Sequence, residues 1–286
     1  MAPALTRRGL LAAAFAMPCV QTTPAGAAVA DPIGAIERRH GGRLGVFVLN
    51  TGSGAVLAHR ADERFLLCST FKGVLAALVL ARVDAGRDDP ARLVPYDEKD
   101  LVAPSPVTEA HVRKGALPVG VLCAAILSVS DNAAANLLLA RVGGPAALTA
   151  FARGLKDGVT RFDRFEPYAG QRSGVLDTTT PRAIVGTART LLLEDALRPA
   201  SRARLEEWMA ACEPGRVRPR AAFPKAWEAV DRTGTGDGAC NDYALVRRAG
   251  RGALVMAAYH DASGMEMAAQ EAVLREVGAT VVAWAG

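Results

Sequence analysis

The stretch LCSTFKG at residues 67–73 decides how the rest of the chain is interpreted. It holds the one place in the sequence where a lysine follows a serine by three residues, Ser69 and Lys72. In a helix this spacing puts both side chains on one face, and the aliphatic run GVLAALVLARV overlaps and extends the stretch. A serine at a helix start lies beside free N–H groups, and a desolvated lysine can accept its proton. The stretch therefore predicts a helix that carries a candidate nucleophile and its base.

Around this helix, apolar periodicity changes twice along the chain. Helical patterns continue to about residue 212, in VGVLCAAILSVS, DNAAANLLLARVG, PRAIVGTARTLLLEDA and SRARLEEWMAAC. Strand patterns occur near both ends, in RLGVFVLN and AVLAHR around NTGSG, and in AWEAVDRTG, NDYALVRRA and GALVMAAYHD. Short helices are expected in GAIERRHGG and MEMAAQEAVLREVGA.

These patterns predict an α+β fold in which both ends of the chain build one sheet. We expect a five-stranded antiparallel sheet, flanked by the terminal helices, beside an all-helical lobe. Residues 31–62 and 213–286 would form the α/β lobe, and residues 63–212 the all-α lobe.

The first 30 residues have the composition of an export signal. Arg7 and Arg8 precede a short apolar stretch that is followed by AGA and AVA, as before a cleavage site. The pair resembles a twin-arginine signal, so we expect an exported, periplasmic or secreted protein without membrane attachment after cleavage.

The net charge of +5 comes without a basic block interleaved with aromatics, so we expect no nucleic acid partner. We also expect a monomer.

Cysteine and histidine give no sign of a metal site. The cysteines that remain after signal removal, Cys68, Cys123, Cys212 and Cys240, match no metal-ligand spacing, and we expect buried, free thiols. The 4 histidines also lack ligand spacing such as H-E-x-x-H. No metal or organic cofactor is implied.

Two further motifs could serve the candidate nucleophile. Ser130-Asp131-Asn132 falls at a break between two expected helices, where it could cap a helix or supply a proton-relaying hydroxyl and an amide. Arg232-Thr233-Gly234 ends an expected strand, where glycine lets a ligand approach and arginine offers a fork for a carboxylate.

S-x-x-K, S-D-N and K-T-G in this order are typical of class A β-lactamases and penicillin-binding proteins. Here lysine of the third motif is replaced by Arg232. CSTFKG, SPVTEAHV, SVSDNAAANLLL, TRFDRFEP, DTTTP and DRTGTGDGACND extend the similarity. The chain therefore resembles a class A serine β-lactamase over essentially its whole mature length. The resemblance implies the β-lactamase/transpeptidase-like fold and a β-lactam substrate.

The resemblance also implies roles for individual residues. Ser69 would attack the lactam carbonyl, with Lys72 or Glu166 as the base, and Ser130 would pass a proton to the leaving nitrogen. Backbone N–H groups of Ser69 and Thr235 would hold the oxyanion. The substrate would be oriented by a larger set: Asn132, Arg232, Thr233, Gly234, Thr235 and Arg218.

A loop at residues 161–177 matches the Ω-type loop of that family. By resemblance, Glu166 activates water, Asn136 braces Glu166, and Arg164 pairs with Asp177. Gly170 stands where the family usually has an asparagine that shares the water, and the loop is shorter. How that water is held is thus left open.

Two alternatives to a β-lactamase are left open. A protein that acylates and stays acylated, as a β-lactam trap or sensor, is favoured by Gly170. A peptidoglycan D-Ala-D-Ala carboxypeptidase would share the three motifs, but the loop with Glu166 argues against it. Some penicillinases of the family that this chain resembles also carry arginine at the position of Arg232, which favours penicillins as substrates. The sequence leaves the full substrate range open.

Overall fold

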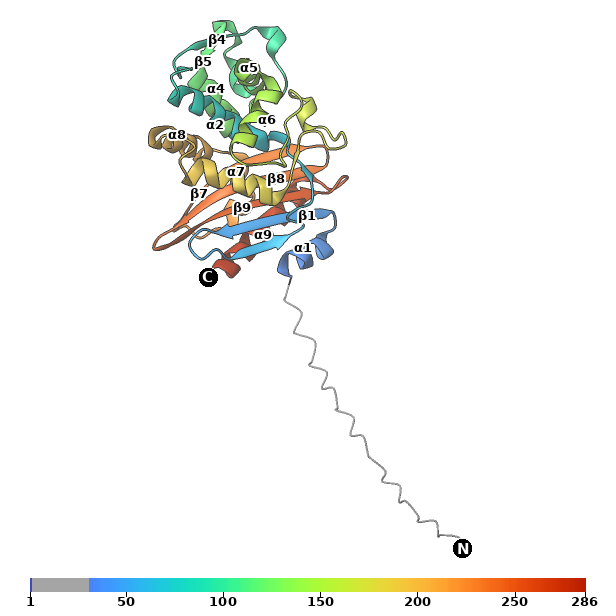
Figure 1. Cartoon of the computed structure of the whole chain (residues 1–286). Helices are drawn as coiled ribbons and strands as arrows, with labels where there is room; N and C mark the ends of the chain where they lie inside the picture. Colours follow the sequence, from blue (N-terminus) through green and yellow to red (C-terminus); the bar gives the residue numbers. More distant parts are fainter. Residues whose placement is uncertain (2–30) are drawn as a thin grey trace. The chain divides into compact units, whose positions relative to one another are not determined.

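A computed structural model of the chain describes Met1 and residues 31–286, and the export signal expected at residues 1–30 otherwise lies outside the described residues. Five antiparallel strands form one sheet in the order β2-β1-β9-β8-β7 (Figure 1). Their bounds are β1 Arg43–Asn50, β2 Val56–His59, β7 Trp227–Gly236, β8 Ala239–Arg248 and β9 Arg251–Asp261. The α+β fold with a sheet built from both ends of the chain is thus confirmed.

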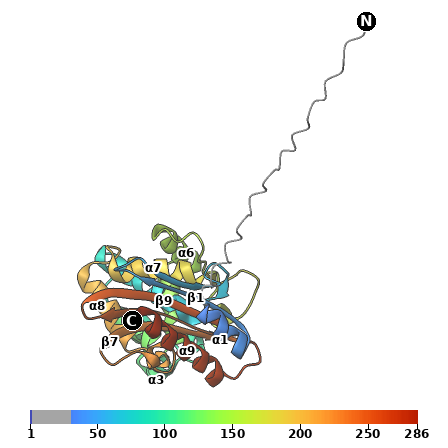
Figure 2. The same ribbon diagram turned by 90° about the horizontal axis from the view of Figure 1, so that it is seen from below.

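One face of the sheet is covered by the two terminal helices, α1 (Pro32–His40) and α9 (Met267–Ala285) (Figure 2). Ile36 of α1 and Leu274 of α9 pack with inward-facing strand residues such as Met256 in one buried cluster. The first helix begins earlier than expected, because the Asp31 side chain caps it by accepting from the Gly34 N–H at 2.8 Å.

The last helix was predicted too short. It continues beyond Ala279 through TVVAWA, a β-branched run that resembles a strand by propensity. Val281 of this run is fully buried against the sheet. Tertiary packing therefore overrides the local preference.

The other face of the sheet carries α7 (Pro181–Leu193), and beyond it lie the remaining helices. Those helices are α2 (Phe71–Asp84), α3 (Pro106–Ala110), α4 (Val119–Ser128), α5 (Asn132–Val142), α6 (Gly144–Gly154) and α8 (Pro199–Ala210). The centre of this group is α2, which packs against α4, α5, α6 and α8. Within the described residues no single helix is long and apolar enough to span a membrane.

The sequence did not predict α6 as a helix. Gly143, Gly144 and Pro145 are residue types typical of turns, but proline is well placed in a first helical turn. Leu148 and Ala152, one turn apart, are its buried positions. The boundaries drawn between the two lobes stay a prediction.

Two short strand pairs connect the loops around the expected site. β3 (Phe65–Leu66), just before Ser69, pairs with β6 (Thr178–Thr179), just after the loop at 161–177. This pairing holds the end of the loop beside the start of α2. The second pair is β4 (Leu93–Pro95) with β5 (Ala116–Pro118).

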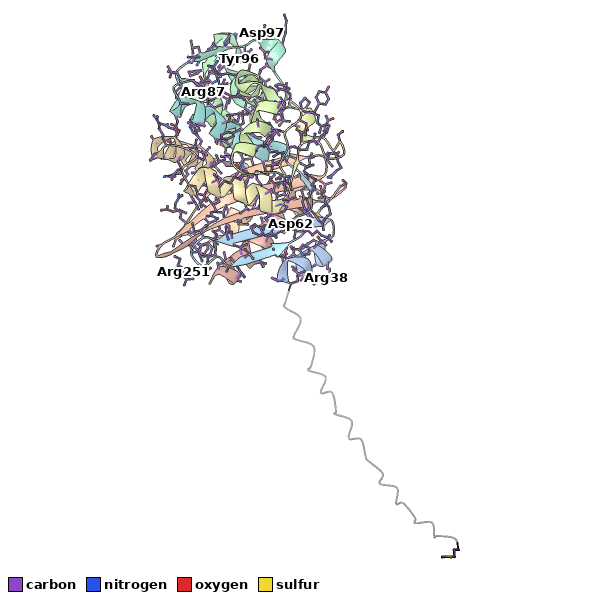
Figure 3. The ribbon with its side chains drawn as sticks, viewed as in Figure 1. Arg38, Asp62, Arg87, Tyr96, Asp97 and Arg251 are labelled. Carbon is purple, nitrogen blue, oxygen red and sulfur yellow. The ribbon has the colours of Figure 1, made fainter. Side chains whose placement is uncertain are left out.

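Short 3₁₀ helices complete the structure: η1 Cys68–Thr70, η2 Glu98–Asp100, η3 Val112–Lys114, η4 Tyr168–Gly170, η5 Pro214–Val217 and η6 Pro219–Ala222. Charged side chains such as Arg38, Arg87 and Arg251 lie at the periphery (Figure 3). Cys68, Cys123, Cys212 and Cys240 are buried and free.

Candidate active site

Ser69 lies in η1, which runs directly into α2, and Lys72 follows in the first turn of α2. Cys68 has a φ of 47°, an uncommon conformation for a residue with a Cβ. β7 passes so close to this turn that a Cβ on Gly234 would lie 2.7 Å from the carbonyl oxygen of Leu67. Glycine at 234 therefore lets the strand run alongside the turn that carries Ser69.

The Lys72 side chain is 0% exposed and is surrounded by acceptors. Its Nζ donates to Asn132 Oδ1 at 2.6 Å and to the backbone oxygen of Ser130 at 2.8 Å. Ser130 Oγ lies 3.2 Å from the same nitrogen, and Glu166 Oε1 lies 3.3 Å from it. Burial lowers the pKa of Lys72 to about 8, although the Glu166 carboxylate opposes this shift. Lys72 can thus change protonation near neutral pH.

Ser130 and Asn132 come from the break between α4 and α5. Ser130 has a φ of 64°, so the chain turns sharply there. Asp131 caps α5 by accepting from the Ala134 N–H at 2.9 Å. Asn132 uses its oxygen on Lys72 and donates its Nδ2 to the Ala103 carbonyl at 3.0 Å. The motif therefore contains both the helix cap and polar groups directed at Lys72.

Glu166 is buried, and its carboxylate contacts both Ser69 and Lys72. Ser69 Oγ donates to Glu166 Oε1 over 3.3 Å. Asn136 on α5 braces the backbone of Glu166, with its Oδ1 2.9 Å from the Glu166 N–H and its Nδ2 3.0 Å from the Glu166 oxygen. The structure thus brings together the hydroxyl at 69, the amine at 72 and the carboxylate at 166.

The loop that carries Glu166 is closed by an ion pair between Arg164 Nε and Asp177 Oδ2 at 2.6 Å. Asp177 also accepts from the Arg164 N–H at 3.1 Å. Gly170 stands beside the Glu166 carboxylate, and a Cβ there would meet Glu166 Oε2 at 3.9 Å and nothing closer. There is room for a side chain at this position.

Two buried arginines lie behind the strand side of the site. Arg232 donates from Nη2 to Ser130 Oγ at 2.7 Å and from Nε to the Ser69 carbonyl at 3.1 Å. Arg218 donates to Thr235 Oγ1 at 2.6 Å and to the Gly234 carbonyl at 3.0 Å. Both guanidinium groups are therefore held by hydrogen bonds to residues that line the cleft or adjoin its lining.

These side chains surround a cleft of about 430 Å³. It is lined by Ser69, Pro104, Val129, Ser130, Asn132, Glu166, Pro167, Gly170, Pro214, Thr233, Thr235 and Gly236. Lys72, Arg218 and Arg232 are buried beneath this lining. Hydroxyl, amine and carboxylate groups in this arrangement suit nucleophilic attack, proton relay and activation of water.

Sequence reasoning did not find the contact between Arg232 and a buried thiol. Cys212 Sγ lies 3.7 Å from Arg232 Nη1, and burial raises the pKa of this thiol. The two residues are 20 positions apart, and nothing in their spacing signals the contact. In the described part of the chain, no group of three or more His, Cys, Asp or Glu side chains could hold a metal ion.

Comparisons with known proteins agree on one family. The model of the beta-lactamase enzyme family matches residues 28–285. A beta-lactamase of Mycobacterium tuberculosis is 43% identical over 278 residues, which is 94% of this chain and 90% of the relative. The carbapenem-hydrolyzing beta-lactamase KPC of Klebsiella oxytoca is 43% identical over 253 residues, covering 86% and 85% of the two chains.

Solved structures give the same result. A beta lactamase from Burkholderia vietnamiensis has a TM-score of 0.89 and 58% identity, covering 91% of this chain and 98% of that chain. An ancestral class A beta-lactamase has a TM-score of 0.86 and 49% identity, covering 88% and 98%.

Proposed function

Because the chain belongs to the beta-lactamase enzyme family and is a class A serine β-lactamase, we propose that it hydrolyses penicillin-type β-lactams through an acyl-enzyme on Ser69. The observation that carries this mechanism is the convergence of three groups in one cleft: Glu166 Oε1 lies 3.3 Å from both Ser69 Oγ and Lys72 Nζ. Ser69 and a water molecule activated by Glu166 would thus attack the same carbonyl carbon, with Lys72 beside both.

Acylation begins when Ser69 Oγ attacks the lactam carbonyl and its proton moves to a base. Ser69 donates to Glu166 in this structure, so Glu166 is the acceptor favoured by geometry, with charged Lys72 stabilising the pair. Lys72 as a neutral amine is the second possibility. As the ring C–N bond breaks, Ser130 passes a proton to the nitrogen, supported by Arg232 at 2.7 Å.

Deacylation is the step that makes this site a hydrolase. Glu166 would remove a proton from a water molecule, which attacks the ester carbonyl and releases Ser69. Backbone N–H groups of Ser69 and Thr235 would hold the oxyanion in both steps. The space beside Gly170 lies next to Glu166 Oε2, where a water molecule could approach the carboxylate.

Substrate recognition would use the strand side of the cleft. Thr233 and Thr235 line the cleft, and Arg218 and Arg232 place positive charge behind them, which suits the carboxylate of a penicillin. Asn132 would hold the amide side chain of the substrate. A relative is named for carbapenem hydrolysis, so carbapenems belong in the substrate panel.

A second candidate function is a β-lactam trap with very slow turnover. Gly170 favours it, because a water molecule beside Glu166 lacks one polar partner that an asparagine would supply. A carboxypeptidase acting on D-Ala-D-Ala peptides remains the third alternative, and Glu166 beside Ser69 argues against it.

We also propose that the chain is exported with a twin-arginine signal and acts as a monomer. The proposal of export rests on Arg7, Arg8 and the apolar stretch that follows them. Replacing both arginines with lysine should stop export.

The proposal of a monomer is tested separately. Light scattering of the mature protein should give the mass of one chain, and a dimer mass would contradict this proposal.

Intact-mass spectrometry after mixing with benzylpenicillin tests the mechanism. The wild type should form an adduct, return to its free mass and release opened product. An adduct that persists would identify a trap. Ser69→Ala should form no adduct, and an adduct on that variant would show that the nucleophile is another residue. Hydrolysis of D-Ala-D-Ala peptide without penicillin turnover would support the carboxypeptidase.

A further inference from the structure

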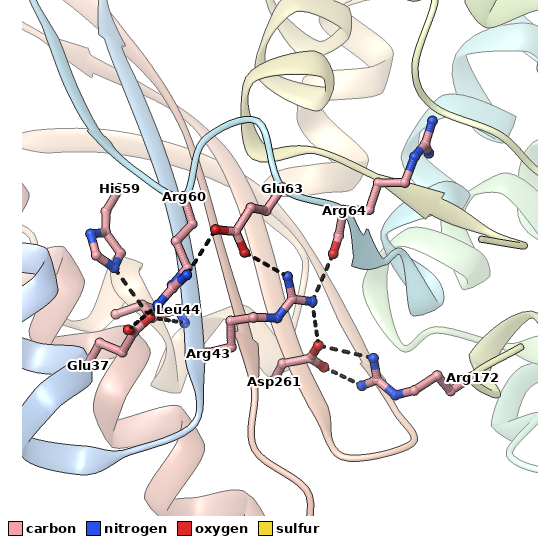
Figure 4. Close-up of polar contacts among 9 residues, drawn as sticks. All are labelled: Glu37, Arg43, Leu44, His59, Arg60, Glu63, Arg64, Arg172 and Asp261. Atoms are coloured by element: carbon pink, nitrogen blue, oxygen red, sulfur yellow. Dashed lines mark hydrogen bonds and ion pairs between the residues drawn. The ribbon is translucent and has the colours of Figure 1, made fainter. Parts of the chain in front are cut away.

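The second half of the Ω-type loop is attached to the sheet by one side chain. Residues 171–175 are exposed, and among the described residues Arg172 alone in this segment reaches the sheet with its side chain. Its guanidinium forms a two-pronged ion pair with Asp261, in which Nη1 lies 3.0 Å from Oδ2 (Figure 4). Asp261 is the last residue of β9, and 89 positions separate the two partners.

Asp261 is a rigid anchor rather than a mobile surface acid. Its side chain is only 10% exposed, and Arg43 of the neighbouring strand β1 donates to Oδ2 at 2.9 Å. Burial alone would raise the pKa of Asp261, but the hydrogen bonds from Arg172 and Arg43 hold it below the ordinary value. Figure 4 shows the chain of alternating charges continuing from Arg43 to Glu63. The carboxylate is thus fixed before the loop meets it.

The backbone beside Arg172 is fastened to the turn between β7 and β8. The Asp237 N–H donates to the Gly170 carbonyl at 3.0 Å, and Arg172 Nη2 lies 3.3 Å from the Asp237 oxygen. The loop lies so close to β7 that a Cβ on Gly236 would overlap the Gly170 carbonyl. Displacement of Arg172 would therefore shift the backbone of Gly170, which lies beside Glu166.

From these contacts we propose that Arg172 is a positioning residue for deacylation. Through its ion pair with Asp261, Arg172 fixes residues 170–172 against the sheet. This attachment keeps Glu166, and the space beside Gly170, at the correct distance from Ser69. The inference rests on the proposed function, since it concerns only the water-dependent step. Acylation depends less on this attachment, because it also uses Lys72 on α2 and Ser130 at the junction of α4 and α5, and Lys72 offers a second base.

Arg172→Ala tests the proposal when acylation and deacylation are measured separately, by quenched flow and intact mass with benzylpenicillin. We expect deacylation to slow roughly tenfold, since small misplacements of catalytic groups have effects of this order. Acylation should slow much less, because Lys72 can also accept the Ser69 proton, so kcat and KM fall together and the acylated fraction at steady state rises. Arg172→Lys should recover part of the deacylation rate.

A matched control exists on α7. Arg182 forms a similar two-pronged pair with Asp62, at 2.7 and 2.9 Å, away from the loop. Arg182→Ala should leave both rate constants unchanged. Asp261→Asn should slow deacylation as Arg172→Ala does, and the double variant should be no slower than the slower single variant.

Three results would overturn the proposal: equal slowing of acylation and deacylation, no change in the acylated fraction, or the same effect from Arg182→Ala. If Arg172→Ala does not fold, Arg172→Lys and Asp261→Asn carry the same comparison. If the proposed function itself is wrong, the wild type will form no Ser69 adduct with benzylpenicillin. The two failures are therefore distinguishable.

Discussion

Lys72 on α2 and Ser130 at the junction of α4 and α5 each have several polar partners within 3.2 Å. Glu166, by contrast, is carried by a loop whose position depends on Asn136, the Arg164–Asp177 pair and Arg172. The acylation side is thus built into the core, whereas the deacylation side is attached to it. Changes in the loop should therefore alter the lifetime of the acyl-enzyme more than its formation.

The largest expected effect is on the core side. Lys72→Met should slow acylation by about 10⁴-fold, at the upper end of the range for a proton-relay group. Single-turnover mass spectrometry with benzylpenicillin measures this rate. Lys99→Met removes an exposed lysine and should have no effect. Rapid acylation of Lys72→Met would mean that the buried amine only supports the structure.

Removing the carboxylate tests the loop side. Glu166→Ala should slow deacylation by about 10³-fold and acylation much less, because Lys72 remains as a base for acylation, so that the acyl-enzyme accumulates. The measurement is the decay of the adduct mass after excess substrate is removed. If this variant clears its adduct at the wild-type rate, another group activates the water and the comparison between the two sides fails.

The pH dependence of kcat/KM can separate the two candidate acylation bases. Burial lowers the pKa of Lys72 to about 8, so its ammonium form predominates below pH 8 and its amine above. If Glu166 accepts the proton while charged Lys72 pairs with it, kcat/KM should fall above pH 8, by up to about tenfold per pH unit. A rise through pH 8 would instead identify neutral Lys72 as the base.

The same pKa shift predicts how folding stability responds to alkaline pH. The folded state binds the Lys72 proton less tightly than the unfolded state, whose pKa is near 10.5. Protonated Lys72 therefore opposes folding below pH 8, and this opposition diminishes between pH 8 and 10.5. Loss of kcat/KM just above pH 8 without loss of the thermal transition would thus report chemistry rather than unfolding.

A smaller effect is expected from restoring the amide in the loop. Gly170→Asn has room for its Cβ, and its amide would give the water beside Glu166 a further partner. We expect deacylation to become roughly threefold to tenfold faster, with acylation unchanged, as measured from the acylated fraction at steady state. An unchanged rate would mean that the loop already holds the water by another contact.

The sequence predicted those parts of the fold and site that depend on local patterns. Alternation identified all five strands of the sheet, and the serine–lysine spacing placed both side chains on one helical stretch. It failed at α6 and at the end of α9, where packing outweighs glycine and β-branched residues. Arg172 with Asp261 and Arg232 with Cys212 could not be found, because arginine carries no periodic signal for a partner from another element.

The smallest predicted effect concerns one of those unforeseen contacts. Cys212→Ala removes the sulfur 3.7 Å from Arg232 Nη1 but leaves Thr233 Oγ1 at 3.4 Å from the same nitrogen. Because sulfur is a weak acceptor, we expect kcat/KM for benzylpenicillin to fall only roughly threefold. In an Arg232→Lys background the same change should have no effect, since the shorter-reaching ammonium lacks Nη1. Equal losses in both backgrounds would mean that Cys212 acts through core packing, and the orientation of Arg232 would then depend on Ser69, Ser130 and Thr233.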